Sequence, residues 1–305
     1  MNCLTITVPA SSANIGPGFD SAGMALNRYL TLHVTPNEEW IFEHRSLHLP
    51  QAPPAEDHFI FNIAKQMAEQ FNANLPPCNI MVESDIPLAR GMGSSASAVV
   101  AGIELANQVC QLELSASEKL RWATKFEGHP DNVAPALLGG LVITAMLSED
   151  RIEFFQTTNI DLDLVLYIPD FELKTEAARK VLPEQFSRNN ATAASSIGNM
   201  MVAALVAGDY QLAGRMMEAD LFHEPYRASL IPNYAEIRRE AKNLGAYGTV
   251  ISGAGPTLIS FAPKGGGQTI VDHLQTMFSD HSVQLVKLDN EGLRVNHQSE
   301  NAICQ

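Results

Sequence analysis

A glycine- and serine-rich stretch at residues 87–97, PLARGMGSSAS, constrains the fold of this chain more than any other segment. It follows a β-rich run at 79–83 and leads into residues 95–110, where apolar side chains recur at helical spacing. We therefore expect a strand, a tight loop and a helix. Gly91 and Gly93 let a backbone approach an anion, and a helix N-terminus presents unpaired N–H groups to it. The stretch predicts a phosphate site, although a serine-capped flexible turn has the same composition.

Two better-known phosphate loops are excluded by the residues around these glycines. No lysine follows the second glycine, as a P-loop requires, and Ala96 stands where the dinucleotide fingerprint needs glycine. Ser94, Ser95 and Ser97 add hydroxyls that can bind phosphate oxygen or a metal ion. The loop is therefore a third kind of phosphate cradle or none.

Composition limits the class of protein. The chain has 305 residues, 46% of them hydrophobic and 18% charged, which fits one large or two smaller globular domains. The formal net charge of −14 argues against a nucleic-acid partner. No apolar run reaches the roughly 18 residues of a membrane span, and the N-terminus lacks a signal-peptide pattern. The four cysteines form no C-x-x-C pair, so we expect reduced thiols and a cytoplasmic protein without membrane partners.

Two further stretches carry polar residues in unusual settings. Residues 9–20, PASSANIGPGFD, follow a strand at 4–8 and place Asn14 and Asp20 in a turn-rich loop, where such residues often make local turns. A helix opened by the capping box Ser115-x-x-Glu118 should end near Glu127, although a carboxylate is disfavoured at a helix C-terminus. A bound metal would explain that glutamate, and we expect Pro130 to stiffen the turn that follows.

Two more motifs lie in the second half of the chain. The spacing Thr-x-x-x-Arg places Thr175 and Arg179 on one helix face, although a solvated helix with a capping threonine explains it equally. The run 252–257, SGAGPT, puts small residues between two strands and allows close backbone approach to a ligand.

Taken in order, these motifs resemble those of the GHMP kinases, and residues 9–20 resemble the homoserine-kinase branch in particular. Met92 stands where the family usually has leucine, a volume-conserving change. The resemblance extends from residue 9 to 257. It implies an α+β, two-domain fold: an N-terminal mixed-sheet nucleotide-binding domain at 1–160 and a C-terminal ferredoxin-like αβ domain at 161–305.

The resemblance also implies a function. It is ATP-dependent phosphorylation of the side-chain hydroxyl of L-homoserine, a step toward threonine, with Mg²⁺ and small-molecule substrates; a homodimer is compatible with it. A GHMP kinase for another small alcohol and a catalytically idle ligand sensor of the same fold are the alternatives. Asp20 together with Arg179 and Arg227 favours a zwitterionic substrate, since a carboxylate suits the ammonium and forked donors suit the carboxylate.

Residue by residue, the resemblance implies four sets. Mg²⁺ would bind Ser95 and Glu127, although Glu127 lies closer to His129 in sequence than in some relatives. The catalytic residues would be Asn132 and Arg227. The substrate would contact Asn14, Asp20, His129, Thr175, Arg179 and Arg227. ATP would contact Pro87, Leu88, Ala89, Arg90, Gly91, Met92, Gly93, Ser94, Ser95, Ala96, Ser97, Gly253 and Gly255.

The resemblance places a neutral amide, Asn132, where many GHMP kinases have a general base. An amide cannot remove a proton, so we expect no strong base, and we interpret Asp131, the rival candidate, as a structural cap. The family places the start of the helix at 58–71 near adenine; we interpret His58 there as solvent-facing. We also expect a core helix at 192–207 and a frayed tail after Arg294.

Overall fold

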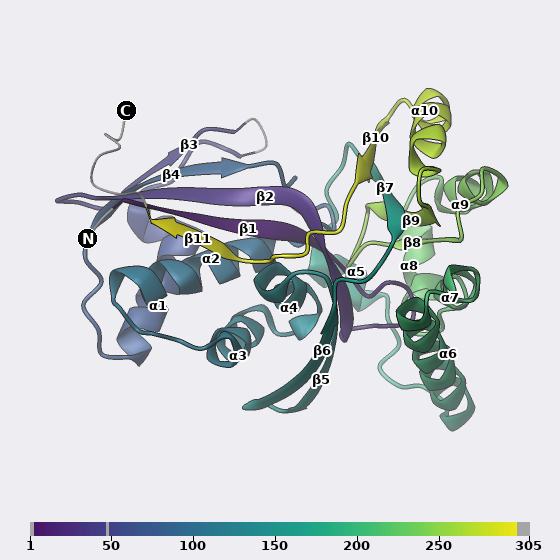
Figure 1. The fold of residues 1–305 in the computed structure, drawn as a ribbon, viewed down its shortest axis with the longest axis horizontal. Helices are drawn as coiled ribbons and strands as arrows, with labels where there is room; N and C mark the ends of the chain where they lie inside the picture. The colour runs from purple at the N-terminus through teal and green to yellow at the C-terminus, as the bar shows by residue number, and fades with distance from the viewer. Residues whose placement is uncertain (1–2, 47–48, 298–305) are drawn as a thin grey trace.

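The computed structural model describes residues 3–46 and 49–297, which form two β-sheets with helices packed beside them. Figure 1 shows α1 to α4 gathered along one face of the first sheet, and α6 to α10 beside the second sheet at the other end of the molecule. The fold class is α+β, as the sequence predicts.

The first sheet is mixed, because β3 and β4 are parallel while its other strand pairs are antiparallel. Its strand order is β11-β1-β2-β4-β3, and β5 pairs with both β2 and β6. The strands are β1 (Leu4–Ala13), β2 (Ala22–Pro36), β3 (Ile41–His44), β4 (Cys78–Ser84), β5 (Leu141–Ser148), β6 (Arg151–Thr157) and β11 (Arg294–His297).

The helices that cover this sheet begin and end where local chemistry dictates. The capping box of Ser115 and Glu118 opens α3, and Gly128 closes it in the left-handed region with φ 91°. The buried side of α2 packs on β1, which positions the glycine-rich loop at the sheet's end. The elements are η1 (Ala55–Asp57), α1 (Phe59–Gln70), α2 (Ser94–Val109), α3 (Ala116–Glu127) and α4 (Pro130–Leu138).

The second sheet has the antiparallel order β10-β7-β9-β8, the arrangement of a ferredoxin-like domain. Its strands are β7 (Leu162–Pro169), β8 (Gly248–Ile251), β9 (Leu258–Pro263) and β10 (His281–Val286). Its helices are α5 (Thr175–Lys180), α6 (Arg188–Ala207), α7 (Tyr210–Met217), α8 (Glu224–Arg227), η2 (Ala228–Leu230), α9 (Tyr234–Asn243) and α10 (Gly267–Met277).

Four local expectations need correction. The strand expected at 4–8 continues to Ala13, because residues 10–13 also pair with β2, after a shift in register between Pro9 and Ala10. Pro130 does not stiffen a turn but opens α4, since proline suits the first helical position. The tail after Arg294 is not all frayed: residues 295–297 belong to β11, which pairs with β1, while the rest of that tail lies outside the described residues.

The fourth correction concerns α6, which we expected in the core. Its buried side chains are only Ala194, Met201, Ala204 and Leu205, because one narrow face meets the protein. Among the described residues it is also the helix that is long and apolar enough to cross a membrane by length and composition, with 22% of that window buried.

Candidate active site

The glycine-rich loop lies directly against the segment after β8. A Cβ added at Gly91, whose φ is +72°, would lie 2.3 Å from the Ser252 carbonyl oxygen. The Ser252 hydroxyl donates to the Gly91 carbonyl (2.6 Å), and its oxygen lies 2.8 Å from Ser12 Oγ in β1. Only glycine fits this approach. Three motifs far apart in the sequence therefore meet at one point.

Gly93 likewise allows a close approach, in this case to β1 and to Asn132 of α4. A Cβ there would lie 2.2 Å from Ser11 Oγ and 3.0 Å from Asn132 Oδ1. Ser11 in turn donates to Asn132 Oδ1 over 2.8 Å, and Asn132 is 9% exposed. The amide is thereby held in one orientation beside the loop.

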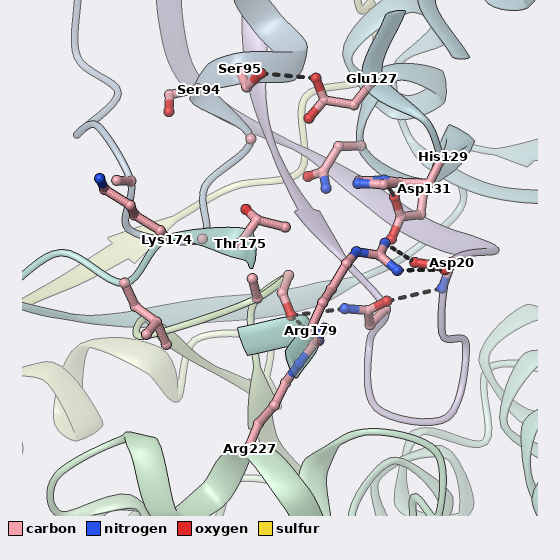
Figure 2. A pocket seen from close by; sticks show the side chains of 18 residues that line it. Asp20, Ser94, Ser95, Glu127, His129, Asp131, Lys174, Thr175, Arg179 and Arg227 are labelled. Atoms are coloured by element: carbon pink, nitrogen blue, oxygen red, sulfur yellow. Dashed lines mark hydrogen bonds and ion pairs between the residues drawn. The ribbon is translucent and has the colours of Figure 1, made fainter. Parts of the chain in front are cut away.

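A cavity of about 290 Å³ opens where these elements meet. Figure 2 shows Ser95 and Glu127 at one end of it and Asp20 with Arg179 at the other, while Lys174 lies on the side of Ser94. The start of α2 and the Asp20–Arg179 pair thus lie at opposite ends of one cavity. Its lining includes Asn132 and every residue that the sequence predicts for substrate binding, namely Asn14, Asp20, His129, Thr175, Arg179 and Arg227.

Ser95 and Glu127 fit a hard cation. The Ser95 hydroxyl, in the first turn of α2, donates to Glu127 Oε2 at the end of α3 over 2.9 Å. Burial raises the pKa of the Glu127 carboxyl, while the bond from Ser95 opposes that shift. Both atoms are oxygens, which Mg²⁺ prefers, and they stand beside the helix end that would receive phosphate.

Two arginines dominate the other end. Arg179 donates to both oxygens of Asp20, over 2.7 and 3.2 Å. Arg227 is 1% exposed and is held by the carbonyl oxygens of Ala178 (3.1 Å) and Gly253 (3.1 Å). Burial and the neighbouring Arg179 lower the pKa of Arg227 to about 10, which still leaves it charged at neutral pH.

Asp131 and His129 form a second charged pair near Asp20. The His129 ring, before α4, contacts the Asp131 carboxylate through Nδ1. Burial alone would lower the pKa of His129, but the bond and charge of Asp131 raise it above its ordinary value. Ligand atoms of Asp20, His129 and Asp131 lie within 4.8 Å of one another, an arrangement that suits a positively charged group. Asp131 is 2% exposed and already engaged, in keeping with a structural role.

Asn14 is engaged as well. Its Nδ2 donates to the Gly253 carbonyl (2.8 Å), and its Oδ1 accepts from the Asp20 N–H (3.1 Å). The side chain therefore shapes the loop that carries Asp20 while it lines the cavity.

The predicted ATP residues divide into two groups. Those that line the cavity are Ala89, Gly91, Gly93, Ser94, Ser95 and Gly253, whereas Pro87, Leu88, Arg90, Met92, Ala96, Ser97 and Gly255 do not. Met92, Ala96 and Ser97 have side chains in the core, at 1%, 0% and 0% exposure. The Ser97 hydroxyl, offered above as a phosphate or metal ligand, instead donates to the carbonyls of Pro9 and Gly93. The Arg90 guanidinium donates to the Pro169 carbonyl over 3.1 Å.

The interpretation of His58 as a solvent-facing residue is wrong. Its side chain is buried, with 5% of the residue exposed. Its Nε2 lies 2.9 Å from the Nε2 of His44, and its ring stacks on Phe42 at 3.9 Å. Burial, with a smaller contribution from His44, lowers its pKa to about 4. With Phe59 it lines an apolar pocket of about 450 Å³ that shares Ser94 and Ser95 with the cavity.

Sequence reasoning missed Lys174 and His223. Lys174 precedes α5 and lines the cavity, where it is the cation on the side of the glycine-rich loop. The signal available in the sequence was that Lys174 directly precedes Thr175, which is itself a predicted substrate residue. His223 is fully buried and touches Arg227, which no pattern in the sequence indicated.

Comparison with known proteins agrees with this geometry. The model of the GHMP kinases N terminal domain matches residues 58–140, and that of the GHMP kinases C terminal domain matches 201–280. The chain is 50% identical over 292 residues to the homoserine kinase of Oceanobacillus iheyensis, covering 95% of this chain and 98% of that one. This chain belongs to the homoserine kinases, a branch of the GHMP kinases.

Other members of the family extend the comparison. The homoserine kinase of Bacillus licheniformis is 47% identical over 299 residues, covering 98% of this chain and 97% of that one. The crystal structure of homoserine kinase from Cytophaga hutchinsonii has a TM-score of 0.83 at 27% identity and covers 97% of this chain and 98% of that one. Mevalonate kinase of L. major, with a TM-score of 0.72 at 17% identity over 93% of this chain and 95% of that one, shares the fold. Membership makes this chain an ATP-dependent kinase that uses Mg²⁺.

Proposed function

We propose that the chain transfers the γ-phosphoryl group of ATP to the side-chain hydroxyl of L-homoserine, forming O-phospho-L-homoserine for threonine biosynthesis. The observation that carries this proposal is the single cavity with a phosphate-type loop at one end and paired acidic and basic side chains at the other. Membership in the homoserine kinases supports the same substrate.

The charged end suits the zwitterionic part of an amino acid. Arg227 and Arg179 would bind the carboxylate, while the Asp20 carboxylate would neutralise the ammonium. Arg179 and Asp20 satisfy each other over 2.7 Å. A bound zwitterion offers each of them a replacement partner, so the pair can open without leaving an unpaired charge.

The other end suits the nucleotide. Backbone N–H groups between Gly91 and Ser95 at the start of α2 would bind phosphate oxygens, and Lys174 would add positive charge on the same side of the cavity. The apolar pocket beside His58 and Phe59 would hold the adenine. Ser95 and Glu127 would hold Mg²⁺, which neutralises charge on the phosphate oxygens when bound.

The transfer needs no side chain that acts as a strong base. The homoserine hydroxyl oxygen bonds to the γ-phosphorus as the bond from that phosphorus to the β–γ bridging oxygen breaks and ADP leaves. The hydroxyl proton passes late to an oxygen of the transferred phosphoryl group. Asn132, held by Ser11, orients the hydroxyl through its amide, because a loose transition state depends on positioning rather than proton removal.

A steady-state assay of ADP release with a panel of acceptors tests this function. We expect turnover with L-homoserine well above that with mevalonate or a sugar. Preference for another alcohol would favour the alternative kinase. ATP binding without turnover on any acceptor would favour the ligand sensor.

We also propose the domain division at about residue 160, a cytoplasmic location and a homodimer. The first is supported by the gap between β6 and β7, where the chain leaves the first sheet; it returns to that sheet at β11. The β5–β6 hairpin, which projects beyond the helices in Figure 1, carries exposed Met146, Leu147, Phe154 and Phe155 that suit a subunit contact. Limited proteolysis, cell fractionation and sedimentation equilibrium test the three in turn.

A further inference from the structure

His223 is a fully buried histidine whose two ring nitrogens have different partners. Its Nε2 lies 2.9 Å from the Gly16 carbonyl oxygen, and its Nδ1 lies 3.2 Å from Nη1 of Arg227. A carbonyl can only accept, so Nε2 carries the proton; a guanidinium can only donate, so Nδ1 is bare. The contacts therefore require a neutral ring in one tautomer.

The surroundings hold this arrangement in place. The Asp220 carboxylate accepts from the backbone N–H groups of Phe222, His223 and Glu224, which fixes the start of α8. Burial is the main cause that lowers the pKa of His223, to about 4, while Asp220 opposes it and Arg227 adds to it. The ring thus stays neutral at the pH of a cell, as the two contacts require.

His223 joins two parts of the amino-acid end that are far apart in sequence. Gly16 belongs to the loop that carries Asn14 and Asp20, whereas Arg227 belongs to α8. Phe19 of the same loop reinforces the link, because its ring stacks on His223 at 5.5 Å and lies 5.3 Å from the Arg227 guanidinium carbon.

We propose that His223 is a positioning residue for the amino-acid substrate: its bare Nδ1 and protonated Nε2 hold Arg227 against the loop at residues 14–20. It acts through Arg227 and sets the affinity for the substrate carboxylate rather than the rate of phosphoryl transfer. The proposal rests on the proposed function only for the identity of that amino acid.

Two substitutions separate the two nitrogens. His223→Gln keeps a donor near Nε2 for Gly16 but removes the acceptor for Arg227, whereas His223→Asn keeps an acceptor near Nδ1. We expect His223→Gln to raise the KM for L-homoserine about tenfold, or about 1.4 kcal/mol, and His223→Asn to raise it less. The kcat and the KM for ATP should stay within about twofold in both. Equal effects of the two variants, or a loss confined to kcat, would overturn the proposal.

Tyr234→Phe is the matched control, because Tyr234 at the start of α9 contacts α8 through Glu224. It removes the half-buried hydrogen bond from the Tyr234 hydroxyl to Glu224, and neither residue lines the cavity. Its homoserine KM should equal that of the unaltered enzyme. A rise like that of His223→Gln would mean that both act only by loosening α8.

A second measurement needs neither substrate nor a folded variant. In the ¹⁵N spectrum of the unaltered protein at pH 7, His223 should show a protonated Nε2 and a bare Nδ1. Protonation at Nδ1 would refute the proposal even if homoserine is the substrate. Absence of turnover on homoserine, with the expected spectrum, would instead reject the proposed function.

Discussion

The two ends of the cavity present different kinds of hydrogen-bond donor, and we predict that both bind anions. The phosphate end uses backbone N–H groups, two glycines in the left-handed region and a helix start, all from one continuous stretch. The amino-acid end uses charged side chains from four segments, with the Asp20–Arg179 pair spanning 159 positions and the Asn14–Gly253 bond spanning 239. We conclude that the first end depends on free space beside the glycine backbone. The second depends on the relative placement of side chains from distant segments, so substitutions should affect the two ends differently.

The largest effect should come from removing clearance at the phosphate end. Gly91→Ala places a Cβ 2.3 Å from a carbonyl oxygen, so we expect nucleotide binding and turnover to fall more than about 100-fold. Calorimetry with a non-hydrolysable ATP analogue measures the first. Gly208→Ala is the control, since its φ of +78° is similar but nothing lies within 4 Å of the added Cβ. Similar losses in both variants would show that backbone strain, not clearance, matters.

The next effect separates the two substrates. Arg227→Leu removes a buried charged donor. The fall in kcat/KM for homoserine should correspond to a loss of roughly 2–5 kcal/mol of transition-state binding, while the affinity for ATP stays near its original value. Arg151→Leu, which removes an exposed pair with Glu153, should change neither. Parallel weakening of ATP and homoserine in Arg227→Leu would point to a folding defect instead.

A smaller effect tests whether Asp131, between the two ends, acts as a base in phosphoryl transfer. Asp131→Asn should lower stability, because the buried contact with His129 weakens, yet keep turnover within about tenfold. Steady-state kinetics and thermal unfolding measure the two effects. If the variant folds normally, binds both substrates and still loses several orders of magnitude in kcat, Asp131 is a base and the base-free mechanism fails.

The smallest effect concerns the stability of the fold at acidic pH. His58 near the phosphate end and His223 near the amino-acid end each have a folded pKa of about 4, below the ordinary value of 6.5. Between pH 4 and pH 6.5 the unfolded chain binds more protons than the folded protein. The free energy of unfolding is therefore at its full value above pH 6.5 and declines as the pH falls toward 4. Urea unfolding at pH 7 and pH 5 measures the decline. His58→Gln and His223→Asn should each reduce it, and an unchanged decline in both would place its origin in other groups.

The same contrast explains what could be predicted from the sequence. The loop at residues 87–97, the capping box before α3 and the alternating strands depend on neighbours in the chain, and the structure has them. The burial of Arg227, the tautomer of His223 and the inward position of His58 depend on partners far away in sequence, which no local pattern specifies. The use of Ser97 as a buried donor to Pro9 belongs to the same group. The roles assigned to individual site residues stay predictions until the variants are measured.

The pairing of β11 with β1 has a consequence for how the protein is made. On one edge residues 4–7 pair with β2, but on the other edge their partners are residues 294–297, so the first sheet cannot be completed during most of translation. At typical ribosome speeds this interval is on the order of 15–60 s. Throughout it, one edge of β1 lies open to pairing with other nascent chains, a known route to aggregation. Slower synthesis at low temperature lengthens that exposure, and truncation before residue 294 makes it permanent.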